Sequence, residues 1–195
     1  QNELHRKEIS ERKQKIMKIL ALDSSGLVAS VAVVENDTLL AEYTVNYKKT
    51  HSQTLLPMLD EISNMTELDL STIDAIAVAG GPGSFTGLRI GSATAKGLGL
   101  ALEKPLISIP TTAAIAYNIW DTNKFVCPIM DARRNQVYTG VYCYTDHRLD
   151  TVWEQDTMSI EALAEGLNCL DHEVIFLGDG VAVCLLYTSP SPRDG

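Results

Sequence analysis

The chain has 195 residues, with 16 Lys and Arg against 25 Asp and Glu, and a formal net charge of −9. Hydrophobic residues make up 45% and charged residues 21%, a globular composition that excludes a fully disordered chain. No apolar run reaches the roughly 18 to 20 residues that a membrane span needs. The acidic balance argues against a protein that grips nucleic acid by itself. Four cysteines without a CxxC pair favour neither a disulfide framework nor a zinc site, and a cytoplasmic location fits best.

Both ends of the chain differ from the middle. Residues 1–16 are mostly polar and precede Met17, which we interpret as the native start after a non-native or disordered extension; a solvated N-terminal helix is the alternative. Residues 184–195 resemble translated sequencing adapter, which predicts a native chain cut near Val183. The remaining core, residues 17–183, holds 10 basic and 21 acidic residues and a net charge of −11.

The first part of the core predicts three strands and then alternating helices and strands. Apolar or alternating runs bounded by turn residues predict an antiparallel meander of three strands over 18–22, 27–34 and 38–47. The later periodicity predicts helices over 52–65, 85–102 and 111–120 and strands over 73–79 and 106–109. Strand–helix–strand connections require parallel pairing, so we expect a mixed sheet covered by helices.

The second part of the core restarts this order. It predicts strands over 125–130, 137–144, 151–155 and 174–177, a turn over 131–136 and a helix over 159–170. We interpret it as an unfinished copy of the first part. The predicted fold is therefore α/β, with a lobe over 17–110 and a related, partial lobe over 111–183.

The segment Gly80 to Ser92, GGPGSFTGLRIGS, lies between a predicted strand and a predicted helix. Backbone amides at such a helix N-terminus can cradle an anion. The segment matches neither the Walker pattern, because Leu88 and Arg89 follow Gly87, nor the Rossmann pattern, because Thr86 replaces a glycine. A tight structural turn is the stronger interpretation.

The helix that follows carries two rows of small residues at four-residue spacing. One row is Gly87, Gly91, Ala95 and Gly99, and the other is Ala93, Gly97 and Ala101. Each interior glycine costs about 1 kcal/mol of helix stability relative to alanine. We therefore expect another part of the protein, or a partner chain, to approach the helix closely and offset this cost. Spacing alone leaves two alternatives open, which are packing against the chain's own sheet and contact with a partner chain.

Several polar residues allow a catalytic interpretation without supporting it strongly. Asp23-Ser-Ser-Gly26 suits contact with a phosphate, although a hairpin needs such residues anyway. Asp131 and Asp179 end strands near turns, where a carboxylate can hold a metal through water or act as a base, although a solvated turn residue is the stronger interpretation of each. No HxxxH or HExxH is present, and no serine has a GxSxG elbow, so neither a metal centre nor a hydrolase triad is favoured.

Four segments together resemble a known family. They read ILALDSS at 19–25, HSQTLLPMLDEI at 51–62, IDAIAVAGGPGSFTGLRIG at 73–91 and PIMDARRNQVYTGVY at 128–142. They resemble the bacterial TsaB family, also called YeaZ, and the match spans residues 17 to about 183. The resemblance implies an actin-like, sugar-kinase-like fold of two related lobes. It also implies a noncatalytic scaffold role in making threonylcarbamoyladenosine at adenosine 37 of tRNA.

The resemblance further implies partners and an interface. In that family TsaB pairs with the transferase subunit TsaD, TsaE joins the pair, and tRNA is engaged only through the complex; the isolated chain is a candidate homodimer. TsaD-type proteins carry a metal-binding HxxxH, which this chain lacks. The first two helices of the first lobe carry the interface. Transferred to this sequence, the interface residues are His51, Leu55, Met58, Pro82, Gly83, Phe85, Thr86, Gly87, Leu88, Arg89, Gly91 and Ala95.

The same resemblance predicts a weakened nucleotide site. The residues at its possible vestige are Asp23, Ser24, Ser25 and Asp131, and the turn over 131–136 contains no glycine. We therefore expect no tightly bound cofactor and no metal, with ATP or ADP bound only within the complex. The alternative function is a stand-alone actin-fold ATPase or small-molecule kinase. A glycoprotease-like hydrolase is weaker still, because no nucleophile–base pair is evident.

Overall fold

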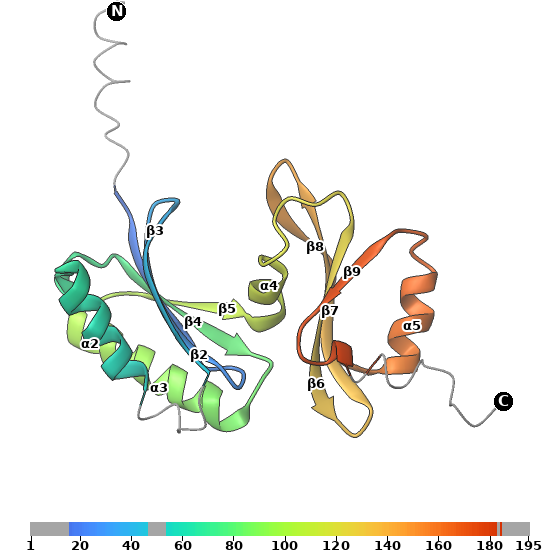
Figure 1. The fold of residues 1–195 in the computed structure, drawn as a ribbon, viewed down its shortest axis with the longest axis horizontal. Coiled ribbons are helices and arrows are strands. Elements are labelled where there is room, and N and C mark those ends of the chain that lie inside the picture. The colour runs from blue at the N-terminus through green and yellow to red at the C-terminus, as the bar shows by residue number, and fades with distance from the viewer. Residues whose placement is uncertain (1–15, 47–53, 183, 185–195) are drawn as a thin grey trace, which may run out of the picture.

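The structure is a computed structural model that describes residues 16–46, 54–182 and 184. Two β-sheets lie on either side of the short helix α4, and further helices cover their outer faces (Figure 1). The first sheet lies within residues 18–110 and the second within residues 125–177. This confirms the predicted α/β fold of two related lobes.

The first sheet has five strands in the order β3-β2-β1-β4-β5. Strands β1, β2 and β3 form the predicted antiparallel meander, and β4 and β5 join it in parallel as the helical crossovers require. Helices α2 and α3 lie side by side on one face of this sheet (Figure 1). The elements are β1 (Lys18–Asp23), β2 (Ala29–Glu35), β3 (Thr38–Val45), α2 (Leu55–Thr66), a 3-10 turn (Leu70–Thr72), β4 (Ala75–Gly81), α3 (Phe85–Leu102) and β5 (Leu106–Pro110).

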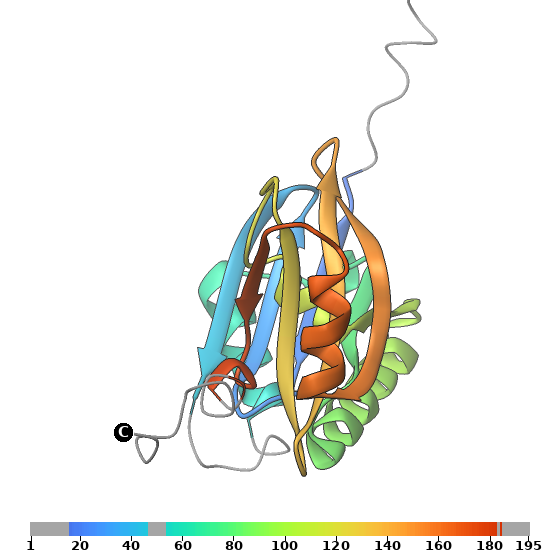
Figure 2. The same cartoon turned by 90° about the vertical axis from the view of Figure 1, so that its right-hand side faces the viewer.

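The second sheet repeats the beginning of the first, in the order β8-β7-β6-β9. Its strands β6, β7 and β8 form an antiparallel meander, and β9 pairs with β6 in parallel, as β4 pairs with β1. Helix α5 lies across the outward face of this sheet (Figure 2). The elements are α4 (Thr111–Ala116), β6 (Phe125–Arg133), β7 (Gln136–Thr145), β8 (Arg148–Ser159), α5 (Ile160–Asn168) and β9 (Val174–Leu177).

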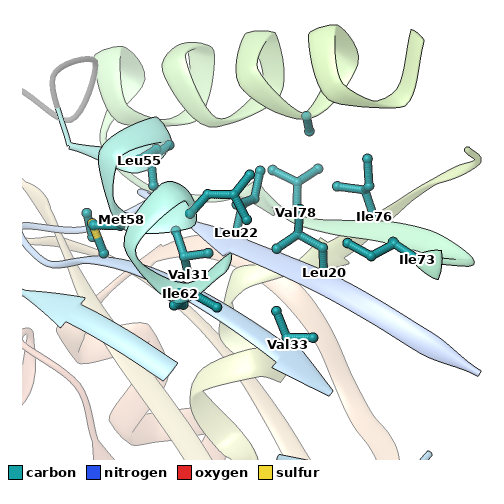
Figure 3. Close-up of a cluster of buried hydrophobic side chains, with 13 residues drawn as sticks. Leu20, Leu22, Val31, Val33, Leu55, Met58, Ile62, Ile73, Ile76 and Val78 are labelled. Carbon is teal, nitrogen blue, oxygen red and sulfur yellow. The ribbon is translucent and has the colours of Figure 1, made fainter. Parts of the chain in front are cut away.

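Alternation in the strands places the core of the first lobe beneath α2 and α3. Leu20, Leu22, Val31 and Val33 occupy every second position of β1 and β2 and are buried. Their side chains meet those of α2 and β4 in one cluster (Figure 3). The second lobe has an equivalent cluster between its sheet and α5. Each lobe therefore has its own core, and α4 contacts both sheets.

Several predicted boundaries differ from the structure, most of all that of the strand predicted over 151–155, which runs from Arg148 to Ser159 as β8. The helix predicted over 111–120 ends at Ala116, where the chain enters a turn. The turn predicted over 131–136 is narrower, because β6 extends to Arg133 and β7 begins at Gln136. Arg133, Arg134 and Asn135 adopt positive φ angles there. Non-glycine residues thus make the reversal, which sequence rules assign mainly to glycine.

Cysteine reactivity provides a test of the second core. Cys127 is fully buried, and burial raises the pKa of its thiol to about 11. A raised pKa leaves the thiol protonated at pH 8, and only the thiolate reacts rapidly. We therefore expect iodoacetamide to modify the exposed Cys169 while Cys127 stays unmodified in the folded chain, as read by peptide mass spectrometry. Equal labelling of both residues would contradict this core packing.

Candidate functional site

The start of α3 is fixed to the hairpin between β1 and β2. The Ser84 amide donates to the Ser25 carbonyl at 2.6 Å, and the Ser84 hydroxyl caps the helix by accepting from the Gly87 amide at 3.3 Å. Ser24 Oγ donates to the Gly87 carbonyl at 2.9 Å from a buried position. A Cβ at Gly83 would collide with the Ser25 carbonyl, so this close approach needs glycine. The glycine-rich segment therefore serves as a structural turn that sets the direction of α3.

The row of small residues on α3 that the sequence singled out first faces the chain's own sheet. Gly87, Gly91, Ala95 and Gly99 are all buried. A Cβ at Gly91 would lie 2.6 Å from Ser24 Oγ and 3.6 Å from Val78 Cγ2. The small size of Gly87, Gly91 and Ala95 therefore lets α3 pack closely on β1 and β4, and their predicted contact with a partner stays a prediction.

Two of the predicted interface residues on α2 lie in the core of the first lobe. Leu55 and Met58 are 1% and 3% exposed, and they point from α2 toward the sheet (Figure 3). They belong to the cluster that contains Leu20 and Leu22. His51 lies outside the described residues. The sequence could not separate these positions because one amphipathic pattern fits a core face and an interface face equally well.

The opposite face of α3 is exposed and contains the second small-residue row. Phe85 is 69% exposed, and the Arg89 guanidinium lies 3.8 Å from its ring centroid. A Cβ added at Gly97 would meet nothing within 4 Å beyond the helix's own backbone, so no packing in the described part of the chain accounts for that glycine. We call this surface the α3 outer face, made of Phe85, Thr86, Arg89, Ala93, Lys96, Gly97 and Leu100.

Helix α2 extends the exposed surface beside α3. The two helices contact each other, and Leu56 is 54% exposed. The remaining predicted interface residues, Pro82, Gly83 and Leu88, are half-buried around the start of α3. An apolar and cationic surface of this kind is typical of protein–protein contacts, which favour aromatic residues and arginine.

A cleft of about 1120 Å³ lies between the lobes. On the side of the first lobe its lining includes Ser25, Gly83 and Phe85, and on the side of the second lobe Asp131, Arg133 and Asp179. The cleft brings together Ser25 and Asp131, two of the residues predicted at a vestigial phosphate site. Because Phe85 belongs to both surfaces, the α3 outer face and the cleft adjoin at the start of α3.

The predicted phosphate-site residues are already engaged within the chain. Asp23 Oδ1 accepts from both the amide and the hydroxyl of Ser25, at 2.8 and 2.7 Å. The Ser24 hydroxyl is held by Gly87, as above. Asp131 Oδ1 accepts from the Arg133 amide at 2.7 Å, and Asp179 Oδ1 accepts from the Asp131 amide at 3.2 Å.

These contacts do not fit a nucleotide phosphate. The hairpin hydroxyls would have to give up their internal bonds before donating to one. Among the described residues that line the cleft, two carboxylates stand against one cation, Arg133, so a phosphate would meet a like charge on the second lobe. Within the described residues no group of three or more His, Cys, Asp or Glu side chains is placed to hold a metal ion that would offset that charge.

Sequence reasoning missed a polar network at the junction of the lobes. Tyr142 of β7 lies 2.7 Å from Thr112 Oγ1, Thr112 Oγ1 donates to Gln155 Oε1 at 2.9 Å, and Gln155 Nε2 donates to the Gly81 carbonyl at 3.3 Å. Thr112 and Tyr142 are buried, and burial raises the pKa of the Tyr142 hydroxyl, which keeps its proton. No local motif marks Gln155, because its partners lie 43 and 74 residues away.

None of the described helices is long and apolar enough to cross a membrane.

The chain is similar to proteins that are already known. A family model described as "TsaD: tRNA N6-adenosine threonylcarbamoyltransferase" matches residues 38–189. The protein named "tRNA threonylcarbamoyladenosine biosynthesis protein TsaB" from Bacillus subtilis is 36% identical over 162 residues, which is 83% of this chain and 71% of that protein. Its Escherichia coli namesake is 33% identical over 170 residues, 84% of this chain and 72% of that protein.

Solved structures show the same fold. The structure titled "YeaZ from Pseudomonas aeruginosa" superposes with a TM-score of 0.68 and 31% identity, covering 75% of this chain and 68% of that one. A second structure, described as an uncharacterized protein similar to peptidase YeaZ from Pseudomonas aeruginosa, has a TM-score of 0.79 and 27% identity. It covers 92% of this chain and 82% of that one.

Proposed function

Because the chain belongs to the TsaB (YeaZ) family, whose role is threonylcarbamoyladenosine biosynthesis in tRNA, we propose that it is the noncatalytic scaffold subunit of the transferase complex. In this role it pairs with a TsaD-type transferase subunit and supports the binding of a TsaE-type ATPase. It works in the cytoplasm and meets tRNA only through the complex. The net charge of −11 over residues 17–183 agrees with a subunit whose partner, rather than the subunit itself, binds the tRNA phosphates.

The observation that carries this proposal is the α3 outer face. It combines the exposed ring of Phe85, the cations Arg89 and Lys96, and the exposed glycine Gly97. Glycine lowers the stability of a helix, and no packing among the described residues offsets this loss at Gly97. A helix of the partner that packs on Ala93 and Gly97 would use the close approach that small residues allow. Phe85 and Arg89 would then lie at one end of the contact, where aromatic residues and arginine contribute most to binding.

Co-purification with the cognate TsaD-type protein tests the proposal. We expect a complex at micromolar concentration when a full-length native chain carries the tag, seen as one peak in size-exclusion chromatography with light scattering. Adding the TsaE-type protein should produce a larger species. A mixture that elutes as two separate proteins at that concentration would contradict the scaffold role. A homodimer peak that disappears as the partner is added would indicate that the homodimer and the complex with the TsaD-type protein form through the same surface of this chain.

We also propose that the isolated chain binds no nucleotide tightly. The internal bonds of Ser24 and Ser25 and the two cleft carboxylates support this. Calorimetry with ATP and magnesium on the isolated chain is expected to show no binding at micromolar concentration. Tight binding with turnover would instead favour the alternative of a stand-alone actin-fold ATPase or kinase.

A further inference from the structure

We propose that Gln155 is a positioning residue through which the second lobe holds the loop that aims the α3 outer face at its partner. Gln155 lies on β8, in the second sheet, and its amide reaches the carbonyl of Gly81, the last residue of β4 in the first sheet. Gly81 is four residues from Phe85, where the α3 outer face begins. This inference rests on the proposed function, since it concerns how the partner surface is presented.

The hydroxyl protons determine which group donates in each hydrogen bond of this network. Thr112 donates its single hydroxyl proton to Gln155 Oε1, so Tyr142 is the donor in the bond between Tyr142 and Thr112. The protonated Tyr142 thus fixes Thr112, Thr112 fixes the amide of Gln155 with its oxygen inward, and the Gln155 amide nitrogen is left facing the Gly81 carbonyl. Only a side chain with an acceptor and a donor on one carbon can make both contacts. Leucine makes neither of them, and glutamate makes only the first.

The loop is held from the first lobe as well. Ser25 accepts from the Ser84 amide, and Ser24 donates to the Gly87 carbonyl. These bonds fix the far end of the loop, at the first turn of α3, while Gln155 fixes the near end at Gly81. The loop between the two anchors therefore depends on the angle between the lobes. A change at β8 is transmitted to Phe85 and Arg89 without any contact between β8 and the partner.

Gln155→Glu tests the inference, because the carboxylate has nearly the shape of the amide but cannot donate to the Gly81 carbonyl. In the full chain we expect this variant to bind the TsaD-type partner about five- to tenfold more weakly, a size typical of one lost hydrogen bond that is partly buried. Amide hydrogen exchange over residues 83–88 should become faster. Gln136→Glu makes the same chemical change at an exposed position and should alter neither quantity.

A second variant keeps the test decisive if Gln155→Glu fails to fold. Thr112→Val preserves the shape of Thr112 and removes the hydroxyl that orients Gln155, so it should produce the same two changes. The double variant should be no worse than the stronger single one, because both act on one network. Unchanged affinity and unchanged exchange in a folded variant would overturn the inference. If the unaltered chain does not bind the partner, the proposed function fails, and the exchange measurement alone decides the role of Gln155.

Discussion

Arg89→Glu is expected to weaken binding of the TsaD-type partner by about ten- to a hundredfold while the isolated chain stays folded. Arg89 is exposed on α3, and its guanidinium lies over the Phe85 ring. The substitution removes this stacked cation and puts the opposite charge at the same place. A carboxylate in the N-terminal half of a helix does not oppose the helix dipole, so the fold itself has little to lose.

The measurement is the dissociation constant of the complex at about 150 mM salt, near physiological ionic strength, with circular dichroism on the isolated variant. Arg148→Glu is the matched control, since it makes the same charge change on an exposed arginine at the start of β8 in the second lobe. It should leave the affinity within a factor of about two. If Arg89→Glu and Arg148→Glu have the same effect, net charge governs association, and the α3 outer face is not the contact surface.

Gly91→Leu is expected to have the largest effect on stability, lowering the free energy of unfolding by about 3 kcal/mol or more. The added Cβ alone would lie 2.6 Å from Ser24 Oγ, and the rest of the side chain would enter the packed space between α3 and Val78. Ser24 would then have to release the Gly87 carbonyl, which breaks one tie between α3 and the hairpin. Urea unfolding followed by circular dichroism measures this loss.

Gly97→Leu is the matched control, because Gly97 lies on the same helix with open space around it. This variant should be at least as stable as the unaltered chain, since glycine is the poorer helix former and a Cβ added at this position meets nothing within 4 Å. The same variant should weaken the TsaD-type complex, because a bulky side chain would hold a partner helix away from α3. A stable Gly91→Leu protein would contradict the packing of α3 on the sheet. A Gly97→Leu protein with unchanged affinity would contradict an interface at this position.

These two glycines show where sequence reasoning succeeds and where it stops. The sequence alone determined that α3 runs from Phe85 to Leu102, because a glycine-rich turn precedes it and apolar periodicity runs through it. It also determined the succession of strands and helices along the chain and the repeat of the meander, which are set by local alternation and by turns. It did not determine which of the two small-residue rows faces the sheet, since both have the same spacing.

The tertiary structure decided the rest. Ser24 and Val78 lie against Gly91, so the row containing Gly91 is the one buried, and the row containing Gly97 is left outside. The same packing places Leu55 and Met58 in the core beneath α2. Gln155 gained its role only when β8 was brought against the end of β4, from 74 residues away. Periodicity and turn chemistry act over a few residues and therefore define elements, whereas the face of each helix and the partner of each buried polar group depend on contacts that form only when the sheets and helices pack together.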